Sequence, residues 1–145
     1  MYTSLGHLGY CSNIHAGESW EDHFSKLKEH IPKIKEKISP LEPFGIGLRL
    51  SHIASLELEK KENLLSFQQW MMENDFYLFT INGFPYGGFH NTRVKDLVHA
   101  PDWLSEERMT YTVRLAKILA ELLPDDLDGG ISTSPLTYKF WHTDL

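Results

Sequence analysis

Apolar residues along the chain alternate between short continuous runs and stripes with helical spacing. The runs at residues 10–15, 44–50, 76–81 and 130–134 predict four β-strands. Between them, apolar side chains recur every three or four residues, which is typical of a helix with one buried face. These stripes are Trp20, Phe24, Leu27, Ile31, Ile34 and Ile38; Leu64, Phe67, Trp70 and Met71; and Met109, Val113, Ala116, Ala120 and Leu123, widened by Leu115, Leu119 and Leu122.

Polar residues and prolines mark where the helices begin and end. Ser19, three residues before Asp22, resembles a capping box and predicts the start of the first helix. Ser51 starts a second helical region, which breaks near Lys60. Pro124 follows the last stripe and closes the third helix, since proline cannot continue a helix.

Strands and helices that alternate in this way predict an α/β fold with a parallel sheet. The third strand is apolar almost throughout, which indicates a strand buried on both faces. Two closures are open at this point: an open doubly wound sheet, or a (β/α)8 TIM barrel, which needs about 250 residues. With 145 residues and four strands, the chain is long enough for half a barrel. No Gly-x-Gly-x-x-Gly sequence follows the first strand, as a dinucleotide-binding sheet would require.

Composition and charge limit which partners the chain can bind and in which cellular compartment we expect it. The chain has 20 acidic and 14 basic residues, a net charge of -6, and no dense basic block, which argues against nucleic-acid binding. The single cysteine, Cys11, cannot form an intrachain disulfide, which fits a reducing compartment, and we expect it to be a small buried apolar residue. There is no 18-residue apolar run and no basic-then-apolar leader, so we expect a cytoplasmic protein without a membrane span.

Candidate binding residues follow the predicted strands. In both closures the ligand lies at the carboxyl ends of the strands. Polar side chains stand at those ends: Asn13, His15, Arg49, Asn82, Thr133 and Ser134. Asparagine, serine and threonine are also ordinary turn residues, so the alternative is that they only terminate the strands.

Residues 82–93 form the segment richest in glycine and aromatic side chains. We expect an ordered loop that covers a site, in which aromatic rings exclude water while His90 and Arg93 meet an anion or move a proton. The alternative is a packed surface loop. Asn82-Gly83 is a hairpin signal, but Pro85 disfavours the second strand of such a hairpin.

The spacing of histidine and carboxylate residues gives little indication of a metal site. The eight histidines include no His-x-x-x-His pair, and the predicted strand ends carry no carboxylate. His23 and His30 lie off the apolar stripe of the first helix, so we expect them to be solvated. No metal ligand is predicted within the chain.

Four segments together resemble a known family. They are YCSNIHAGESW (10–20), FGIGLRLS (44–51), FTINGFPYG (79–87) and IST (131–133). These segments are similar to the metabolite traffic protein EboE family, which belongs to the xylose-isomerase-like TIM barrels together with sugar-phosphate isomerases and epimerases. The similarity spans almost the whole chain but covers only the N-terminal part of the family.

The resemblance implies that residues 1–145 are a single N-terminal portion of such a barrel, with the first four β/α units. It places Asn13, His15, Arg49, Asn82 and His90 near the barrel mouth and implies a role with a small, sugar-like metabolite. Metal-binding carboxylates of the superfamily lie mainly on later strands, so a divalent metal is expected only if a C-terminal half supplies the ligands. Whether the chain is an isomerase-like enzyme, a non-catalytic binding module or an inactive truncated fragment stays open.

Two expectations follow for the assembly and for Arg49. Half a barrel leaves two sheet edges uncovered, so we expect a homo-oligomer. Arg49 alternates with Leu48 and Leu50 and should point to the mouth, where its guanidinium suits a carboxylate or phosphate of a ligand. The alternative for Arg49 is a salt bridge to a neighbouring acidic side chain.

Overall fold

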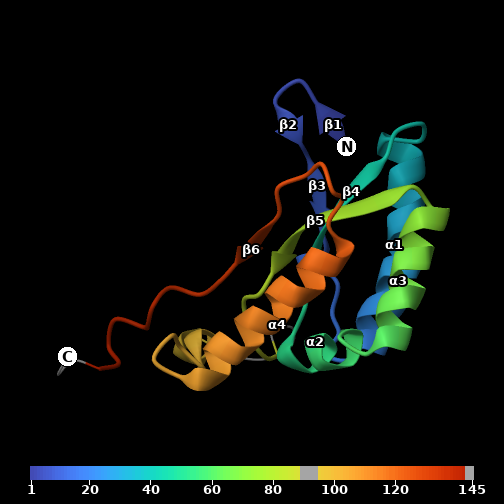
Figure 1. Cartoon of the computed structure of the whole chain (residues 1–145). Helices are drawn as coiled ribbons and strands as arrows, with labels where there is room; N and C mark the ends of the chain where they lie inside the picture. Colours follow the sequence, from blue (N-terminus) through green and yellow to red (C-terminus); the bar gives the residue numbers. More distant parts are fainter. Residues whose placement is uncertain (89–94, 143–145) are drawn as a thin grey trace.

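The computed structural model describes residues 1–88 and 95–142 (Figure 1). Within these residues the strands are β1 (Tyr2–Thr3), β2 (Gly6–His7), β3 (Gly9–Cys11), β4 (Phe44–Arg49), β5 (Phe76–Asn82) and β6 (Gly130–Ser132). The α-helices are α1 (Trp20–Ile38), α2 (His52–Leu58), α3 (Lys61–Glu73) and α4 (Glu106–Leu122), and the 3-10 turns are η1 (Ser12–Ile14) and η2 (Lys95–His99).

A parallel sheet of four strands organises the described residues, in the spatial order β3-β4-β5-β6. The predicted α/β class with a parallel sheet is confirmed. The first and last strands are shorter than predicted, because the chain turns into η1 after Cys11 and leaves the sheet after Ser132. The antiparallel hairpin of β1 and β2 was not predicted. Each of these strands has only two residues, which is too short for an alternation of polar and apolar residues to be recognised.

Local sequence signals fix the helix starts. Ser19 and Asp22 form the predicted capping box at α1, with the Ser19 hydroxyl accepting a hydrogen bond from the Asp22 amide at 3.1 Å. Ser51 caps α2 in the same manner through the amide of Ala54. The predicted break near Lys60 separates α2 from α3.

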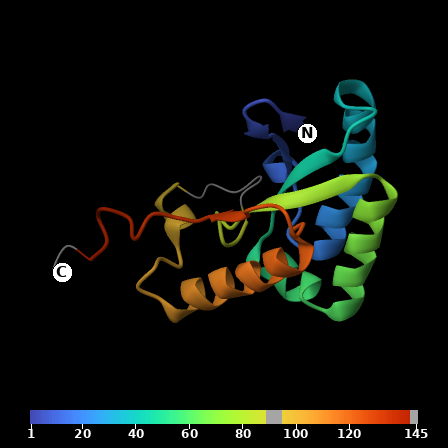
Figure 2. The same ribbon diagram turned by 45° about the horizontal axis from the view of Figure 1, so that its top comes forward.

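The helices pack on one face of the sheet, and Figures 1 and 2 show α1, α3 and α4 on the same side of the strands. The core lies between them. Its fully buried side chains include Ile46 and Leu48 of β4, Leu78 of β5 and Phe67 of α3. We call the other face of the sheet, which none of the described helices covers, the open face.

The buried face of α4 agrees with the predicted one in part: Leu115, Leu119 and Leu122 are buried as predicted, but the main stripe is not. Met109 and Val113, the first two residues of the predicted stripe, are 52% and 50% exposed. The buried residues are Arg108, Tyr111, Leu115, Ile118, Leu119 and Leu122. Two apolar stripes compete on this helix, and it turns its bulkier leucine and tyrosine side chains inward because they bury more apolar area than alanine and valine.

Strand β5 was predicted to be buried on both faces, and this is wrong for its open face. The register of β4 against β5 shifts between Ile46 and Gly47, which pair with Leu78 and Thr80. The extra residue, Phe79, forms a bulge, and its ring lies half-buried on the open face.

Beyond β6, the chain runs alongside residues 99–103 and away from the sheet (Figures 1 and 2). The Trp103 amide donates to the Leu136 carbonyl at 3.0 Å, and its indole donates to the Ser134 carbonyl at 3.2 Å. Among the described residues, no helix is long and apolar enough to cross a membrane.

Candidate functional site

A hollow of about 480 Å³ lies on the open face, toward the carboxyl ends of the strands. All strands of the parallel sheet contribute to its lining, so it depends on the sheet and not on one loop. The described residues that line it are Gly9, Cys11, Gly47, Phe79, Thr80, Ile81, Asn82, Gly130, Ile131 and Ser132.

Glycines keep this hollow open. A Cβ atom on Gly9 or Gly45 would come within 3.0 Å of the Phe79 ring, so these glycines let the ring lie flat across β3 and β4. A Cβ on Gly130 would meet no atom within 4 Å and would point into open space. The floor of the hollow is therefore backbone, and Phe79 supplies one aromatic wall.

Polar groups converge at the rim where the strands end. Asn82 pairs in the sheet with Ser132, and the Ser132 hydroxyl donates to Asn82 Oδ1 at 2.6 Å. The same oxygen accepts the Phe84 amide at 3.2 Å, which fixes the orientation of the Asn82 side chain. The Asn82 amide NH₂ is thus the end of the side chain turned to other acceptors.

Arg49 does not reach this hollow, because it is wholly buried among loops at the end of β4. Its Nη1 donates to the Gly17 carbonyl at 3.1 Å and its Nη2 to the Gly87 carbonyl at 3.2 Å. Nη1 also lies 3.4 Å from His23 Nε2, and Nη2 lies 3.5 Å from the Glu18 carboxylate. The ion pair to Glu18 corresponds to the alternative reading of Arg49 as a structural residue.

The aromatic and glycine-rich segment begins as a fixed loop over residues 83–88. Arg108 donates to the Gly83 carbonyl at 3.0 Å, and the His52 amide donates to the Tyr86 carbonyl at 2.8 Å. The Tyr86 ring stacks on the His52 ring, with centroids 4.4 Å apart. Together with the Arg49 contact, these bonds hold the loop by its carbonyl groups along its length.

Arg108 and Tyr111 form the buried support of that loop, and the sequence analysis missed both. Arg108 donates to the Pro101 carbonyl at 2.8 Å, and burial lowers the pKa of its guanidinium. The Tyr111 hydroxyl donates to the Leu50 carbonyl, and burial raises the pKa of this phenol above its ordinary value. Their spacing could have indicated this, because Arg108 and Tyr111 share one face of the helix with Leu115.

His15 and Asn13 lie apart from the hollow as well. His15 is buried, with its Nε2 3.0 Å from the Tyr10 hydroxyl and its ring stacked on His30 at 4.7 Å. His23 is buried at 3% exposure, so the expectation that it is solvated is wrong. The helical stripe alone could not reveal this, because Arg49 and the loop before α1 cover that side of the helix.

The structure therefore does not bring the predicted site residues into one cavity. Asn82 lines the hollow, whereas Arg49 and His15 are buried outside its lining. Thr133 is exposed and Ser134 is buried beyond β6. The two remaining predictions, for His90 and Arg93, fall on residues outside the described ranges.

Cys11 is exposed at the rim of the hollow, so the prediction of a buried cysteine is wrong. The reason is that β3 is an edge strand and Cys11 shares the row of Gly47 on the open face. Within residues 1–88 and 95–142, no group of three or more histidine, cysteine, aspartate or glutamate side chains is placed to hold a metal ion.

Unsatisfied buried polar atoms gather beyond the ends of the strands. Among the described residues they are Asn13 Oδ1, Arg49 Nε, His99 Nδ1, Arg108 Nη2 and Ser134 Oγ. Asn13, Arg49 and Ser134 follow or end strands of the parallel sheet, whereas His99 lies in η2 and Arg108 in α4. Most buried polar groups have a partner, so Asn13, Arg49 and Ser134 give the carboxyl edge of the sheet hydrogen-bonding capacity that the described residues leave unused.

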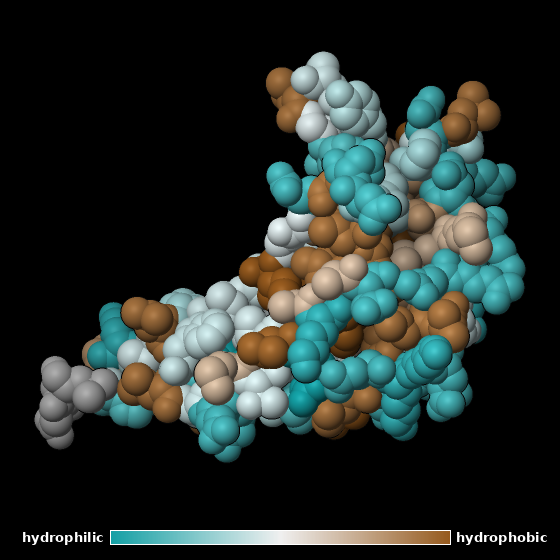
Figure 3. All heavy atoms as spheres, in the orientation of Figure 1, coloured by the Kyte–Doolittle hydropathy of each residue, from teal (hydrophilic) through white to brown (hydrophobic). Residues whose placement is uncertain are grey.

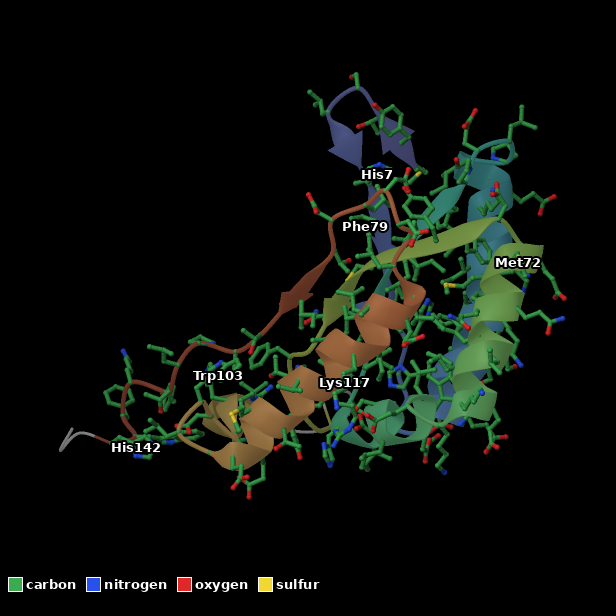
Figure 4. The ribbon with its side chains drawn as sticks, in the orientation of Figure 1. His7, Met72, Phe79, Trp103, Lys117 and His142 are labelled. Carbon is green, nitrogen blue, oxygen red and sulfur yellow. The ribbon has the colours of Figure 1, made fainter. Side chains whose placement is uncertain are left out.

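A second carboxyl-edge feature joins the segment after β6 to the loop before α4. The Asp102 carboxylate accepts the Thr137 hydroxyl at 2.5 Å and lies 3.0 Å from His142 Nε2. The hydrogen bond from Thr137 is the main cause that lowers the pKa of Asp102. Figure 4 shows Trp103 and His142 in this outlying part of the chain, away from Phe79.

The other large hollow lies on the opposite side, as a groove of about 460 Å³ between α3 and α4. Its lining mixes apolar and charged side chains, among them Leu64, Leu65, Gln68, Lys117 and Ile118. No strand end contributes to it, so it lacks the position at which parallel sheets bind ligands.

Comparison with known proteins adds no family. No family model matches the chain, and neither a curated protein nor a solved structure resembles it significantly. The fold and the site thus define a class only: a mixed α/β protein with a four-stranded parallel sheet within its described residues and a hollow on the open face of that sheet.

Proposed function

We propose that the chain forms the first four β/α units of a TIM-type barrel and binds a small, neutral, sugar-like metabolite in the cytoplasm. The resemblance to the EboE family suggests the same class of ligand. Residues Phe79, Thr80, Asn82 and Ser132 are the proposed binding side chains, and glycines of β3, β4 and β6 make room for the ligand.

The winding of the chain supports the half-barrel. The strands follow one another in space in the order they have in the chain, and the helices lie on one face. A doubly wound sheet reverses its strand order and carries helices on both faces. A barrel has neither feature, since its helices form one outer ring.

The observation that carries the proposed function is the lining of the open-face hollow. An aromatic ring, a serine, a threonine and an asparagine surround a glycine floor. Aromatic faces and neutral hydrogen-bonding groups suit a polyhydroxylated molecule, which has apolar C–H faces and many hydroxyls. Arg49, the proposed anion ligand of the sequence analysis, is not among the lining residues, so the structure favours a neutral ligand over an anionic one.

Binding without turnover is the form of this function that the lining favours. The described residues around the hollow include no carboxylate, imidazole or ammonium group, and the Cys11 thiol is their one ionisable side chain. An isomerase-like activity would need such groups from elsewhere. We therefore propose a metabolite-binding module whose ancestry is that of the isomerase-like barrels.

Saturation-transfer NMR with D-xylose, D-xylulose and myo-inositol tests this proposal. We expect transfer from the protein to at least one of these sugars in the wild-type chain. Gly130→Leu should abolish it, because the new side chain enters the hollow without striking an existing atom. Ala120→Leu, which adds the same side chain on an exposed part of α4, should leave it unchanged.

Two results would remove the proposal. One is the absence of transfer to all three sugars in the wild-type chain. The other is equal transfer in the wild type and in Gly130→Leu, with circular dichroism showing both to be folded. Loss of binding in Ala120→Leu would instead locate the ligand on the helix side of the sheet.

A further inference from the structure

Among the described residues, no strand pairs with either outer edge of the parallel sheet, and no helix covers its open face. Parallel sheets are normally covered on both faces. Here the helices cover one face, and of the described elements the β1–β2 hairpin lies on the open face, at the amino ends of the strands (Figure 2). Figure 3 shows apolar atoms, in brown, at the surface between this hairpin and the helices.

The two edges are matched in direction. The outer strands of the sheet are β3 and β6, and every strand pair between them is parallel. The Ser132 carbonyl accepts the Gly83 amide on the β5 side, so the backbone groups of its neighbour Ile131 point to the outer edge. The outer edge of β6 can therefore accept a further strand. The β3 strand of a second copy would run parallel to β6 there.

We propose that two copies of this chain close one eight-stranded parallel barrel, in which β6 of each copy pairs with β3 of the other. A rotation of 180° about an axis along the strands preserves their direction, so both new edges pair in parallel at once. Each copy contributes the four strands of its parallel sheet, so two copies supply the eight strands of a TIM-type barrel. Closure also removes both sheet edges, which otherwise are sites of uncontrolled association.

This proposal rests on the half-barrel of the proposed function and completes its site. The hollow is bounded by the strands of one copy and open on the side where the partner would stand. In the closed barrel, the partner's strands would face Phe79 and Asn82 across the axis. The open-face glycines then leave the barrel interior less filled than usual, which preserves space for a ligand at its centre.

The hairpin fits the amino-terminal end of such a barrel. The ammonium group of Met1 donates to the Tyr77 hydroxyl at 2.8 Å, and His7 Nδ1 lies 2.9 Å from the same oxygen. His7 also packs on Phe79, with ring centroids 6.0 Å apart (Figure 4). The hairpin therefore covers the open face at one end of the strands only and leaves the carboxyl end accessible.

The single exposed cysteine makes the proposed pairing directly testable. Within one chain, three strand spacings separate β3 from β6, which is about 14 Å. A disulfide requires Cα atoms within about 7 Å, so Cys11 cannot reach a cysteine on β6 of its own chain. Between copies, the proposed closure brings β3 and β6 into contact.

The experiment introduces one cysteine at Gly130 or Ser132 of β6 and oxidises each variant with diamide at low protein concentration. Two positions on alternate residues are used because closing a barrel staggers the strands along one another. We expect at least one variant to form disulfide-linked dimers at ten times the level of the control Ser66→Cys, which adds a cysteine on an exposed part of α3. Peptide mapping should find the bond between Cys11 and the new residue.

The proposal is overturned if no variant exceeds the Ser66→Cys control, or if native mass spectrometry of the wild-type chain finds monomers alone at micromolar concentration. These results are distinct from failure of the proposed function. A monomer that binds the sugars removes the closed barrel and keeps the binding site, whereas a cross-linked dimer that binds none of them keeps the barrel and removes the ligand.

Discussion

The two faces of the parallel sheet are built on different principles. The helix-covered face carries Ile46, Leu48 and Leu78, all with no exposed surface. The open face carries glycines, serine and threonine around the half-buried ring of Phe79. The first face is filled to stabilise the fold, and the second is left unfilled at the position where parallel sheets bind ligands.

The largest expected difference between the faces is in stability. Leu78→Ala should lower the free energy of unfolding by about 3 kcal/mol, because it leaves a cavity in the core. Thr80→Ala, two residues further along the same strand, should lower it by less than about 1 kcal/mol. Urea unfolding of both variants measures this, and similar losses would contradict the distinction between the faces.

Arg49 gives the next largest effect. Arg49→Leu leaves the Gly17 and Gly87 carbonyls without their donor and should cost about 2 kcal/mol of stability. The cost is smaller than the roughly 3–5 kcal/mol for a buried ion pair, because the Glu18 side chain is 40% exposed and regains water.

Arg49→Lys is the matched control, which keeps the charge but lacks the two-pronged donor, and it should lose about half as much. Sugar binding per folded molecule should be unchanged in both variants, since Arg49 does not line the hollow. Unaltered stability with lost binding of an anionic metabolite would restore the ligand role that the sequence suggested.

Tyr111→Phe removes the hydroxyl that donates to the buried Leu50 carbonyl and should lower stability by about 1 kcal/mol at neutral pH. Burial raises the pKa of Tyr111 in the folded state, so the unfolded state releases its proton first as the pH rises. Wild-type stability should therefore fall above about pH 10. The variant should lack this component, and an equal alkaline loss in both would contradict it.

His52 gives the smallest expected effect. Burial, and then the nearby Arg114, lower the pKa of His52 from 6.5 in the folded state. The unfolded state binds the proton more readily, so stability should decrease as the pH falls below about 6.5. Comparing wild type with His52→Gln between neutral and mildly acidic pH isolates this loss. An NMR titration of His52 with a pKa above 6.5 would refute it.

Periodicity predicted the parallel sheet and the helix starts, because those depend on local spacing and capping residues such as Ser19. On α4 it was right for Leu115, Leu119 and Leu122 but wrong for the main stripe that begins at Met109, because two stripes compete there and only packing decides between them. It also missed the bulge at Phe79, since an apolar run carries no sign of a shifted register.

The sequence indicated polar residues at the strand ends, but it did not indicate which of them line the hollow. Asn82 lines the hollow as expected, and Arg49 stands at the expected strand end. Alternation could not show that loops before α1 and after β5 would fold over Arg49 and bury it. The glycines of the floor carry no side chain, so their contribution is visible only in space.

The most direct test of the account is to map sugar-induced chemical-shift changes onto backbone amides of the labelled wild-type chain. The open-face hollow predicts the largest changes at Gly47, Thr80 and Ser132 during titration with the best-binding sugar. Changes centred on Leu65 and Lys117 would instead place the ligand in the groove between α3 and α4 and contradict the central claim.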